Sequence, residues 1–208
     1  MRVVLYGASG TIGSRILQEL LKRGHAVTAV VRDASKVTAS GPGVRQGNVL
    51  DPASVAATAA GADAAISAYA PPPEDTAKLV EATRSLVAGL KIAGVSRLLT
   101  VGGAGSLRVA NGGQLMNVPD FPAVWKPIAI SHSDALDVLR QADLDWTNFS
   151  PAALIQPGER TATFRLGMDD LITDAKGDSR ISAEDYAIAM VDELENPQHT
   201  RQRFTIGY

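Results

Sequence analysis

The stretch Val3–Gly13 reads V-V-L-Y-G-A-S-G-T-I-G and decides the fold. It opens with four apolar residues that do not alternate with polar ones, a pattern typical of a strand buried on both faces of a parallel sheet. Three glycines follow with the spacing Gly-x-x-Gly-x-x-Gly. Beyond them, apolar residues recur at helical spacing over Ile16–Leu21, and Gly24 stands where a helix would end. The stretch therefore predicts a buried strand, a glycine turn and an amphipathic helix.

A second apolar run, Ala26–Val31, completes a strand–helix–strand unit of about thirty residues. In such a unit, a glycine turn that leads into a helix can bind the diphosphate of a dinucleotide. The first glycine makes the tight turn, the second lets the backbone approach the diphosphate, and the third lets the helix pack on the strand. The helix N-terminus adds free N–H groups, and Ser9 and Thr11 add hydroxyl donors. We expect a dinucleotide site here, the alternative being a strand–helix turn that binds nothing.

The alternation of strands and helices continues along the chain. Further strands are expected at 44–49, 62–68, 97–101, 144–149 and 203–206, and helices after Asp51-Pro52, around 79–90, at 128–141 and at 183–195. This order predicts a Rossmann-like, doubly wound α/β fold with a mostly parallel sheet, in a single domain of residues 1–208. Residues 155–182 lack a regular pattern and are expected to be loop-like. We expect residues 150–208 to contribute a small, irregular cap on the substrate side.

The composition excludes several classes of function. Lys plus Arg number 20 against 22 for Asp plus Glu, so no basic excess indicates a nucleic-acid or membrane partner. The chain has no cysteine, which excludes disulfides, thiolate catalysis and iron–sulfur clusters. The three histidines are far apart in the sequence, and we expect no metal site. No signal peptide or membrane-spanning segment is recognisable, so we expect a cytoplasmic monomer or homodimer that acts on a small molecule.

The end of the second strand discriminates between the two nicotinamide cofactors. Arg32 occupies the position where NAD enzymes carry an acidic residue that binds the ribose 2′-hydroxyl. Its guanidinium can bind a 2′-phosphate, and Lys36 can add positive charge. We therefore expect NADP(H) to be preferred over NAD(H). Two alternatives stay open. In the first, Asp33 accepts a hydrogen bond from the ribose 2′-hydroxyl while Arg32 turns to solvent; in the second, Arg32, Asp33 and Lys36 are all surface charges.

Ligands of open α/β sheets bind at the carboxyl ends of the strands, and this rule selects the other candidates. Asn48 and Val49 suit the edge and the face of an adenine ring. The predicted cofactor-binding residues are Gly7, Ser9, Gly10, Thr11, Ile12, Gly13, Arg32, Lys36, Asn48, Val49, Ser67, Ala68, Tyr69, Gly102, Gly103, Pro151 and Ala152. The acceptor is expected under the 102–122 loop and the C-terminal third. Trp125 is a candidate to line its pocket, and 157–161 either caps that pocket or is a structural turn.

Two side chains are candidates for the chemistry itself. Ser106 follows the glycine-rich exit of the fifth predicted strand and can donate to an acceptor or to the nicotinamide carboxamide. The alternative is an incidental serine in a loop. His132 shares the inward stripe of its helix with Leu136 and Leu139. It is a candidate hydrogen-bond donor or proton source, or else a half-buried structural histidine.

These residues together resemble the atypical short-chain dehydrogenase/reductase superfamily. Within it, the chain is similar to the bacterial NAD(P)H–flavin reductase group, related to biliverdin-reductase-B-like and NmrA-like proteins. The motifs are Gly7–Gly13 with Arg32, Val101–Leu107, Asp145–Ala152, Pro157–Thr161, Ile181–Tyr186 and Arg203–Tyr208, and the resemblance covers nearly the whole chain. It implies a Rossmann-like fold, a nicotinamide cofactor, and hydride transfer to an acceptor such as a flavin or a quinone.

One departure from the superfamily affects the expected chemistry. Conventional members carry Tyr-x-x-x-Lys on the helix after the fifth strand, where the tyrosine exchanges a proton with the substrate. The corresponding segment, Phe121–Ser133, reads F-P-A-V-W-K-P-I-A-I-S-H-S and lacks this pair. Alcohol oxidation or sugar epimerisation by that route is therefore not expected. Hydride transfer to a flavin is still compatible with the sequence, because the electronic structure of the flavin ring itself lets it accept the hydride. The alternative function is that of an NmrA-like sensor, which binds NAD(P) without turnover.

Overall fold

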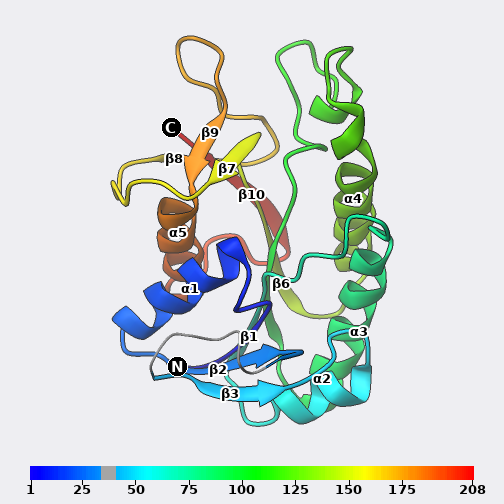
Figure 1. Ribbon diagram of the computed structural model, residues 1–208, viewed down its shortest axis with the longest axis vertical. Helices are drawn as coiled ribbons and strands as arrows, with labels where there is room; N and C mark the ends of the chain where they lie inside the picture. Colours follow the sequence, from blue (N-terminus) through cyan, green and yellow to red (C-terminus); the bar gives the residue numbers. More distant parts are fainter. Residues whose placement is uncertain (34–40) are drawn as a thin grey trace.

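The computed structural model describes residues 1–33 and 41–208 of the chain. In this part, a sheet of eight strands has the order β3-β2-β1-β4-β5-β6-β10-β8 (Figure 1). The strands are β1 (Arg2–Tyr6), β2 (Ala26–Val31), β3 (Gly43–Gln46), β4 (Ala64–Ser67), β5 (Arg97–Val101), β6 (Asp145–Ser150), β8 (Arg165–Gly167) and β10 (Gln202–Gly207). Neighbours pair in parallel except β8, which is antiparallel to β10. The strand order reverses direction between β1 and β4, as in Rossmann-like sheets, so the predicted fold class is confirmed.

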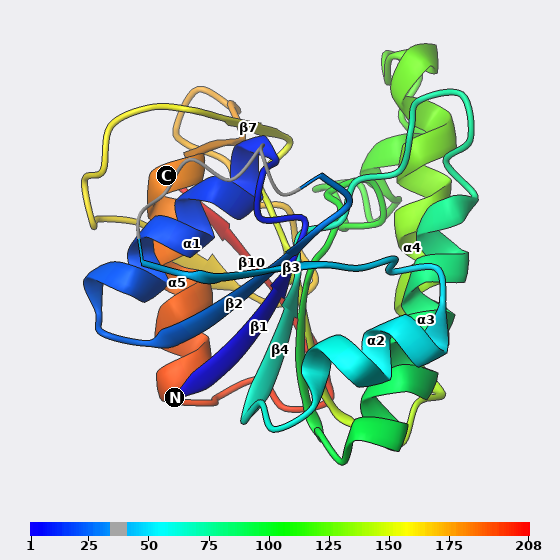
Figure 2. The same cartoon turned by 60° about the horizontal axis from the view of Figure 1, so that its bottom comes forward.

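Helices cover both faces of this sheet. Figure 2 shows α1 (Thr11–Lys22) and α5 (Ala183–Glu195) on one face, and α2 (Pro52–Ala59), α3 (Lys78–Ala93) and α4 (Lys126–Arg140) on the other. Two 3₁₀ turns, η2 (Leu115–Asn117) and η3 (Ala123–Trp125), precede α4, which begins two residues before the predicted start. None of the helices in the described residues has the length and apolar character needed to span a bilayer.

Burial on both faces explains the apolar run of β1. Val3 and Leu5 lie in the core shared with α1 and α5, whereas Val4 and Tyr6 lie in the core shared with α2, α3 and α4. Inside the second core, the hydroxyl group of Tyr6 forms a hydrogen bond with Thr58 Oγ1, at 3.0 Å. A strand placed between two helical layers needs apolar side chains on both faces, which is why the sequence shows no alternation.

The local signals for helix ends are confirmed. Gly24 follows α1 with φ +79°, the left-handed conformation that glycine adopts without a steric cost. Asp51 precedes α2, and its carboxylate accepts a hydrogen bond from the backbone N–H of Ala53 at 3.0 Å. These signals depend on a few neighbouring residues, and they could therefore be recognised in the sequence alone.

The C-terminal segment is more regular than the predicted loop over 155–182, and that prediction is wrong in part. The short strands β7 (Leu154–Gln156) and β9 (Arg180–Ser182) pair in parallel as a separate sheet, while β8 extends the main sheet. Each of these strands has only three residues, too few for an alternating pattern to show. Figure 1 shows this segment beyond one end of α1 and α5.

The loop between β7 and β8 is held against α1 and α5 by buried carboxylates. Asp185 of α5 is fully buried and accepts hydrogen bonds from Thr161 Oγ1 at 2.5 Å and from Tyr208 OH at 2.7 Å. Arg160 forms an ion pair with Glu19 of α1 at 3.0 Å. The 157–161 segment is thus anchored on these helices, and both its role as a cap over an acceptor and the alternative of a structural turn stay predictions.

Candidate functional site

The glycine turn between β1 and α1 leaves no space for side chains at its two ends. Gly7 has φ +78°, and a Cβ atom placed on it would lie 2.4 Å from the carbonyl oxygen of Ala68. A Cβ atom on Gly13 would lie 2.1 Å from the carbonyl oxygen of Gly7. Real Cβ atoms essentially never come this close to a backbone atom to which they are not bonded, so glycine is required at both positions. The first and third glycines therefore have the turn and packing roles that the motif predicts.

Gly10 differs from its two partners because its outer side is open. A Cβ atom on Gly10 would meet only the carbonyl oxygen of Gly7, at an ordinary 3.4 Å. Gly10 precedes α1, and this helix has no side-chain cap and no acidic residue in its first turn. By contrast, Ser182 caps α5, which carries Glu184 and Asp185 in its first turn. The start of α1 thus presents bare backbone and uncompensated N–H groups, which fit a diphosphate.

The residues around this opening are placed as an anion site requires. Ser9, Gly10 and Thr11 are exposed, while Ile12 is half-buried and packs on the core that α1 shares with α5. Ser9 and Thr11 therefore lie on the accessible side of the turn. Contact between these residues and a cofactor stays a prediction.

Arg32 lies beyond the end of β2 and is exposed. Burial raises the pKa of Tyr69, which follows β4, and the positive charge of Arg32 acts against that rise, so the two side chains are close enough to interact across the end of β1. Asp33 has an interaction partner of its own. Lys36 lies outside the described residues. Arg32 and Tyr69 therefore border the same region of the carboxyl edge.

Asn48 and Val49, predicted to contact adenine, form the loop between β3 and α2. Asn48 is exposed, and its carboxamide oxygen accepts a hydrogen bond from the backbone N–H of Leu50 at 3.1 Å. Its backbone N–H donates to Ser54 Oγ at 2.9 Å. Val49 is mostly buried in the core shared with α2 and α3. These contacts support the loop, with Asn48 rather than Val49 on the accessible side.

The ends of β4, β5 and β6 bring the remaining predicted residues to the same edge. Ser67 is buried at the end of β4, and Ala68 forms the floor beneath Gly7. At the end of β5, Gly102 donates its backbone N–H to the carbonyl oxygen of Phe149 at 2.7 Å. Pro151 and Ala152 leave β6 as buried residues. Within the described residues, the sheet therefore collects the predicted cofactor residues at the ends of six strands, β1 to β6.

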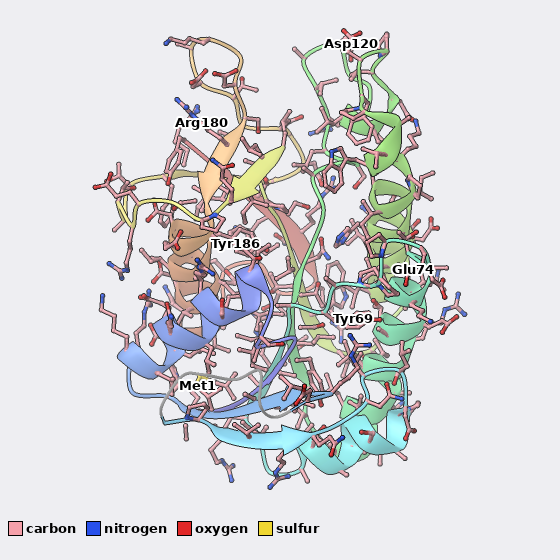
Figure 3. The ribbon with its side chains drawn as sticks, in the orientation of Figure 1. Met1, Tyr69, Glu74, Asp120, Arg180 and Tyr186 are labelled. Atoms are coloured by element: carbon pink, nitrogen blue, oxygen red, sulfur yellow. The ribbon has the colours of Figure 1, made fainter. Side chains whose placement is uncertain are left out.

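Tyr186 supports this edge and was not recognised as a site residue from the sequence. It is fully buried in α5, and its hydroxyl donates at 2.5 Å to the carbonyl oxygen of Phe149, the same atom that accepts from Gly102. Burial raises the pKa of Tyr186 well above its usual value, so the hydroxyl keeps its proton. Tyr186 and Tyr69 lie on opposite sides of the sheet (Figure 3). The only available signal was one hydroxyl on an otherwise apolar helix face.

His132 of α4 is packed directly against the loop that leaves β5. A Cβ atom on Gly103 would lie 2.7 Å from Cβ and Cγ of His132, so the imidazole can pack here only because residue 103 has no side chain. Desolvation lowers the pKa of His132 to about 4. The imidazole is therefore neutral near pH 7 and carries one N–H donor and one acceptor nitrogen. The structure thus places this catalytic candidate next to a predicted cofactor-binding glycine.

The lowered pKa of His132 predicts a loss of stability in acid. Below pH 6.5 the unfolded chain binds a proton at this histidine that the folded chain resists, so stability is full above 6.5 and declines as the pH falls toward 4. The decline is on the order of 3 kcal/mol. Urea unfolding over this pH range should show it in the wild type and show less of it in His132→Gln. Equal pH slopes for the two proteins would mean that His132 is solvated.

Ser106, the other catalytic candidate, is held in a different environment. Its hydroxyl oxygen accepts a hydrogen bond from Arg203 Nη1 of β10 at 2.8 Å, and Arg203 Nε donates to Asp169 at 2.8 Å. These contacts tie the 104–107 loop to the outer part of the sheet. Ser106 is thus an anchor of its loop, and a contact with cofactor or acceptor stays a prediction.

Two hollows in the described surface lie away from this edge. One, of about 340 Å³, is lined mainly by Trp146, Met168 and the first residues of β10. The other, of about 380 Å³, lies at the amino ends of β1 and β2. Neither is lined by the glycine turn, Arg32, Gly103 or His132. The candidate site is defined by the strand ends and the bare start of α1.

Comparisons with known proteins show the family to which the chain belongs. A family described as NAD(P)H-binding matches residues 7–197. The uncharacterized protein YwnB of Bacillus subtilis is 44% identical over 99% of this chain and 98% of its own. A solved "putative exported protein" from Burkholderia pseudomallei is 48% identical, with a TM-score of 0.92 and full coverage of both chains.

Two further solved structures carry different functional descriptions. A "putative epimerase" from Bacteroides thetaiotaomicron is 44% identical, with a TM-score of 0.93, covering 100% of this chain and 96% of that one. A "putative NADH-flavin reductase" from Streptococcus pneumoniae is 34% identical, with a TM-score of 0.89, covering 100% and 99%. The family match begins at Gly7, the first residue of the glycine turn. The chain therefore belongs to the NAD(P)H-binding family of atypical short-chain dehydrogenase/reductase-like proteins, with a Rossmann-like fold and an oxidoreductase-like NAD(P) site.

Proposed function

We propose that the protein is an NADPH-dependent oxidoreductase that passes a hydride to a flavin, a quinone or a similar planar acceptor. The observation that carries the proposal is the combination at the carboxyl edge of the sheet. A bare helix start and Arg32 suit a phosphorylated dinucleotide, whereas α4 offers His132 in place of a Tyr-x-x-x-Lys pair. An acceptor that needs no tyrosine to exchange its proton fits such a site.

The chain's own residues perform the binding and positioning. The backbone at Gly10 and the first N–H groups of α1 hold the diphosphate, and Arg32 holds the 2′-phosphate. Gly102 and Gly103 present flat backbone to a planar ring, and the hydrogen bonds of Phe149 with Gly102 and Tyr186 fix that backbone. NADPH, when bound, supplies the hydride. With a nicotinamide and an acceptor bound, these residues would hold the two rings face to face, which is the main requirement for hydride transfer.

His132 serves as a neutral donor beside the reacting ring. Its lowered pKa means that almost no imidazolium is present near pH 7, so the residue supplies a hydrogen bond and not a full proton. The reduced acceptor takes its proton from solvent. This favours acceptors whose reduced form is stable as an anion, such as flavins and quinones, over simple carbonyl compounds.

The direct test is NADPH oxidation with FMN, riboflavin and small quinones as acceptors. We expect saturable turnover with at least one of them. Saturable NADPH binding without turnover on any acceptor would overturn the proposal and favour the alternative, a non-catalytic NmrA-like sensor. The proposal also takes the partner to be a small molecule, with residues 150–208 covering it.

Arg32→Ala tests the preference for NADP(H). We expect the Kd for NADPH to rise about 10- to 100-fold, because a charged hydrogen bond to the 2′-phosphate contributes roughly 1.5–3 kcal/mol. The Kd for NADH should change less than about threefold, since that cofactor lacks the phosphate. Arg45→Ala on the adjacent strand β3 is the matched control, because Arg45 is also an exposed arginine. Equal weakening of both cofactors by Arg32→Ala would show that Arg32 does not bind the 2′-phosphate.

A further inference from the structure

Asn148 is a buried amide near the carboxyl end of β6, and the sequence gave no reason to select it. It is in register with Thr100 of β5, so the two side chains point to the same face of the sheet. Trp146, two residues earlier on β6, packs in the core shared with α2, α3 and α4, which identifies that face. Asn148 is only 4% exposed. A buried amide on this face lies beside the candidate site and needs partners for both of its ends.

The hydrogen bonds around Asn148 determine which way its amide points. Nδ2 donates to Thr100 Oγ1 at 2.9 Å, and Thr100 Oγ1 directs its own proton to the carbonyl oxygen of Thr147 at 3.5 Å. A hydroxyl that already donates its proton can only accept from its other neighbour, so the amide turns its NH2 group toward Thr100. Oδ1 is therefore the outward end, and no residue in the described part of the chain donates a hydrogen bond to it.

Gly102 keeps this oxygen uncovered. A Cβ atom on Gly102 would lie 2.5 Å from Oδ1 and 3.1 Å from Cγ of Asn148, so any side chain at residue 102 would cover the amide. Three side-chain atoms in the described residues are fully buried without a partner, and Oδ1 is not among them, so a ligand can reach it. An unpartnered oxygen and bare backbone thus coincide where β5 ends.

The chemistry of Oδ1 specifies what it binds. An amide oxygen only accepts hydrogen bonds, so its partner must carry an N–H or O–H group. Leaving such an oxygen without a donor once a ligand covers it costs free energy, and this cost makes the site selective. In the proposed function a nicotinamide ring lies against Gly102 and Gly103, and the carboxamide of that ring carries an NH2 group.

We propose that Asn148 Oδ1 accepts a hydrogen bond from the carboxamide NH2 group of the nicotinamide, and that Thr100 positions the amide for this contact. The inference rests on the proposed function and adds two residues that orient the ring. A ring turned over about its glycosidic bond would carry its carboxamide away from Oδ1. Asn148 therefore fixes which face of the nicotinamide is turned toward the acceptor.

Two analogues of NADP⁺ test the contact without any turnover. The 3-acetylpyridine analogue has a methyl group in place of NH2, whereas the thionicotinamide analogue keeps NH2 and exchanges only the carbonyl oxygen for sulfur. We expect calorimetry to show about tenfold weaker binding of the acetylpyridine analogue than of NADP⁺, because the methyl group leaves Oδ1 without a donor. The thionicotinamide analogue should bind within about threefold of NADP⁺. Equal Kd values for NADP⁺ and the acetylpyridine analogue in the wild type would overturn the proposal.

Variants then assign the preference to these two residues. Asn148→Leu removes the acceptor at nearly constant volume, and its Kd values for NADP⁺ and the acetylpyridine analogue should agree within about twofold. Thr100→Val frees the amide to turn, so the preference should fall below about threefold, whereas Thr100→Ser should keep it. Ser150→Ala is the matched control, since it removes an unpartnered hydroxyl two residues further along the same face of β6 and should leave the preference at about tenfold.

The outcomes separate this inference from the proposed function. A tenfold preference that persists in a folded Asn148→Leu variant, or saturable NADP⁺ binding without any preference, would refute only the role of Asn148. The preference in a wild type that turns over no acceptor would refute only the proposed reaction. A wild type that does not bind NADP⁺ would refute both.

Discussion

Replacing Gly13 with alanine should lower the free energy of unfolding by more than about 3 kcal/mol, a large loss for a single methyl group. The added Cβ would lie 2.1 Å from the carbonyl oxygen of Gly7 and 2.8 Å from its carbonyl carbon. Both atoms belong to the backbone, so no flexible side chain can move aside. α1 would have to separate from β1, and the core that packs between them would open. Urea unfolding followed by circular dichroism measures this loss.

The control for Gly13→Ala is an alanine three residues earlier in the same turn. A Cβ atom on Gly10 meets nothing closer than 3.4 Å, and Gly10 has φ −76° and ψ 170°, a conformation open to any residue. The free energy of unfolding of Gly10→Ala should therefore be within about 1 kcal/mol of the wild-type value, since this is the usual cost of alanine at a helix N-cap. If Gly13→Ala were equally stable, the close packing of α1 on β1 would be wrong.

The parts of the fold that the sequence predicts are those in which nearby residues carry the information. The apolar run of β1 indicates burial on both faces. Gly24 indicates the end of a helix, where the backbone adopts the left-handed conformation, and Asp51 indicates a helix N-cap. The roles of Gly7 and Gly13 follow from the geometry of one turn. Most of these interactions span only a few positions along the chain, or repeat a pattern that every buried parallel strand shares; the contact of Gly7 with Ala68 is distant, but the positive φ of Gly7 is a local requirement.

The features that the sequence did not reveal depend on distant partners. Tyr186 donates to a carbonyl group 37 positions away, and Ser106 accepts from Arg203, 97 positions away. No local pattern distinguishes a tyrosine that supports the site from one that fills the core. β7, β8 and β9 have three residues each, so their pairing is determined by tertiary contacts. The candidate site was predicted by position at the strand ends, whereas its supporting hydrogen bonds required the structure.

The contrast between the two glycines gives the sharpest test of the cofactor site. Gly10→Ala should keep the fold and yet weaken NADPH binding at least about 100-fold, equivalent to about 2.7 kcal/mol. The new methyl group would occupy the open side of Gly10, where the diphosphate must approach the backbone at the start of α1. The measurement is an NADPH titration by calorimetry, beside a thermal unfolding curve of the same sample. Wild-type affinity in a folded Gly10→Ala variant would place the diphosphate elsewhere on the strand ends, whereas lost affinity together with lost stability would mean that the methyl group disturbs the turn itself.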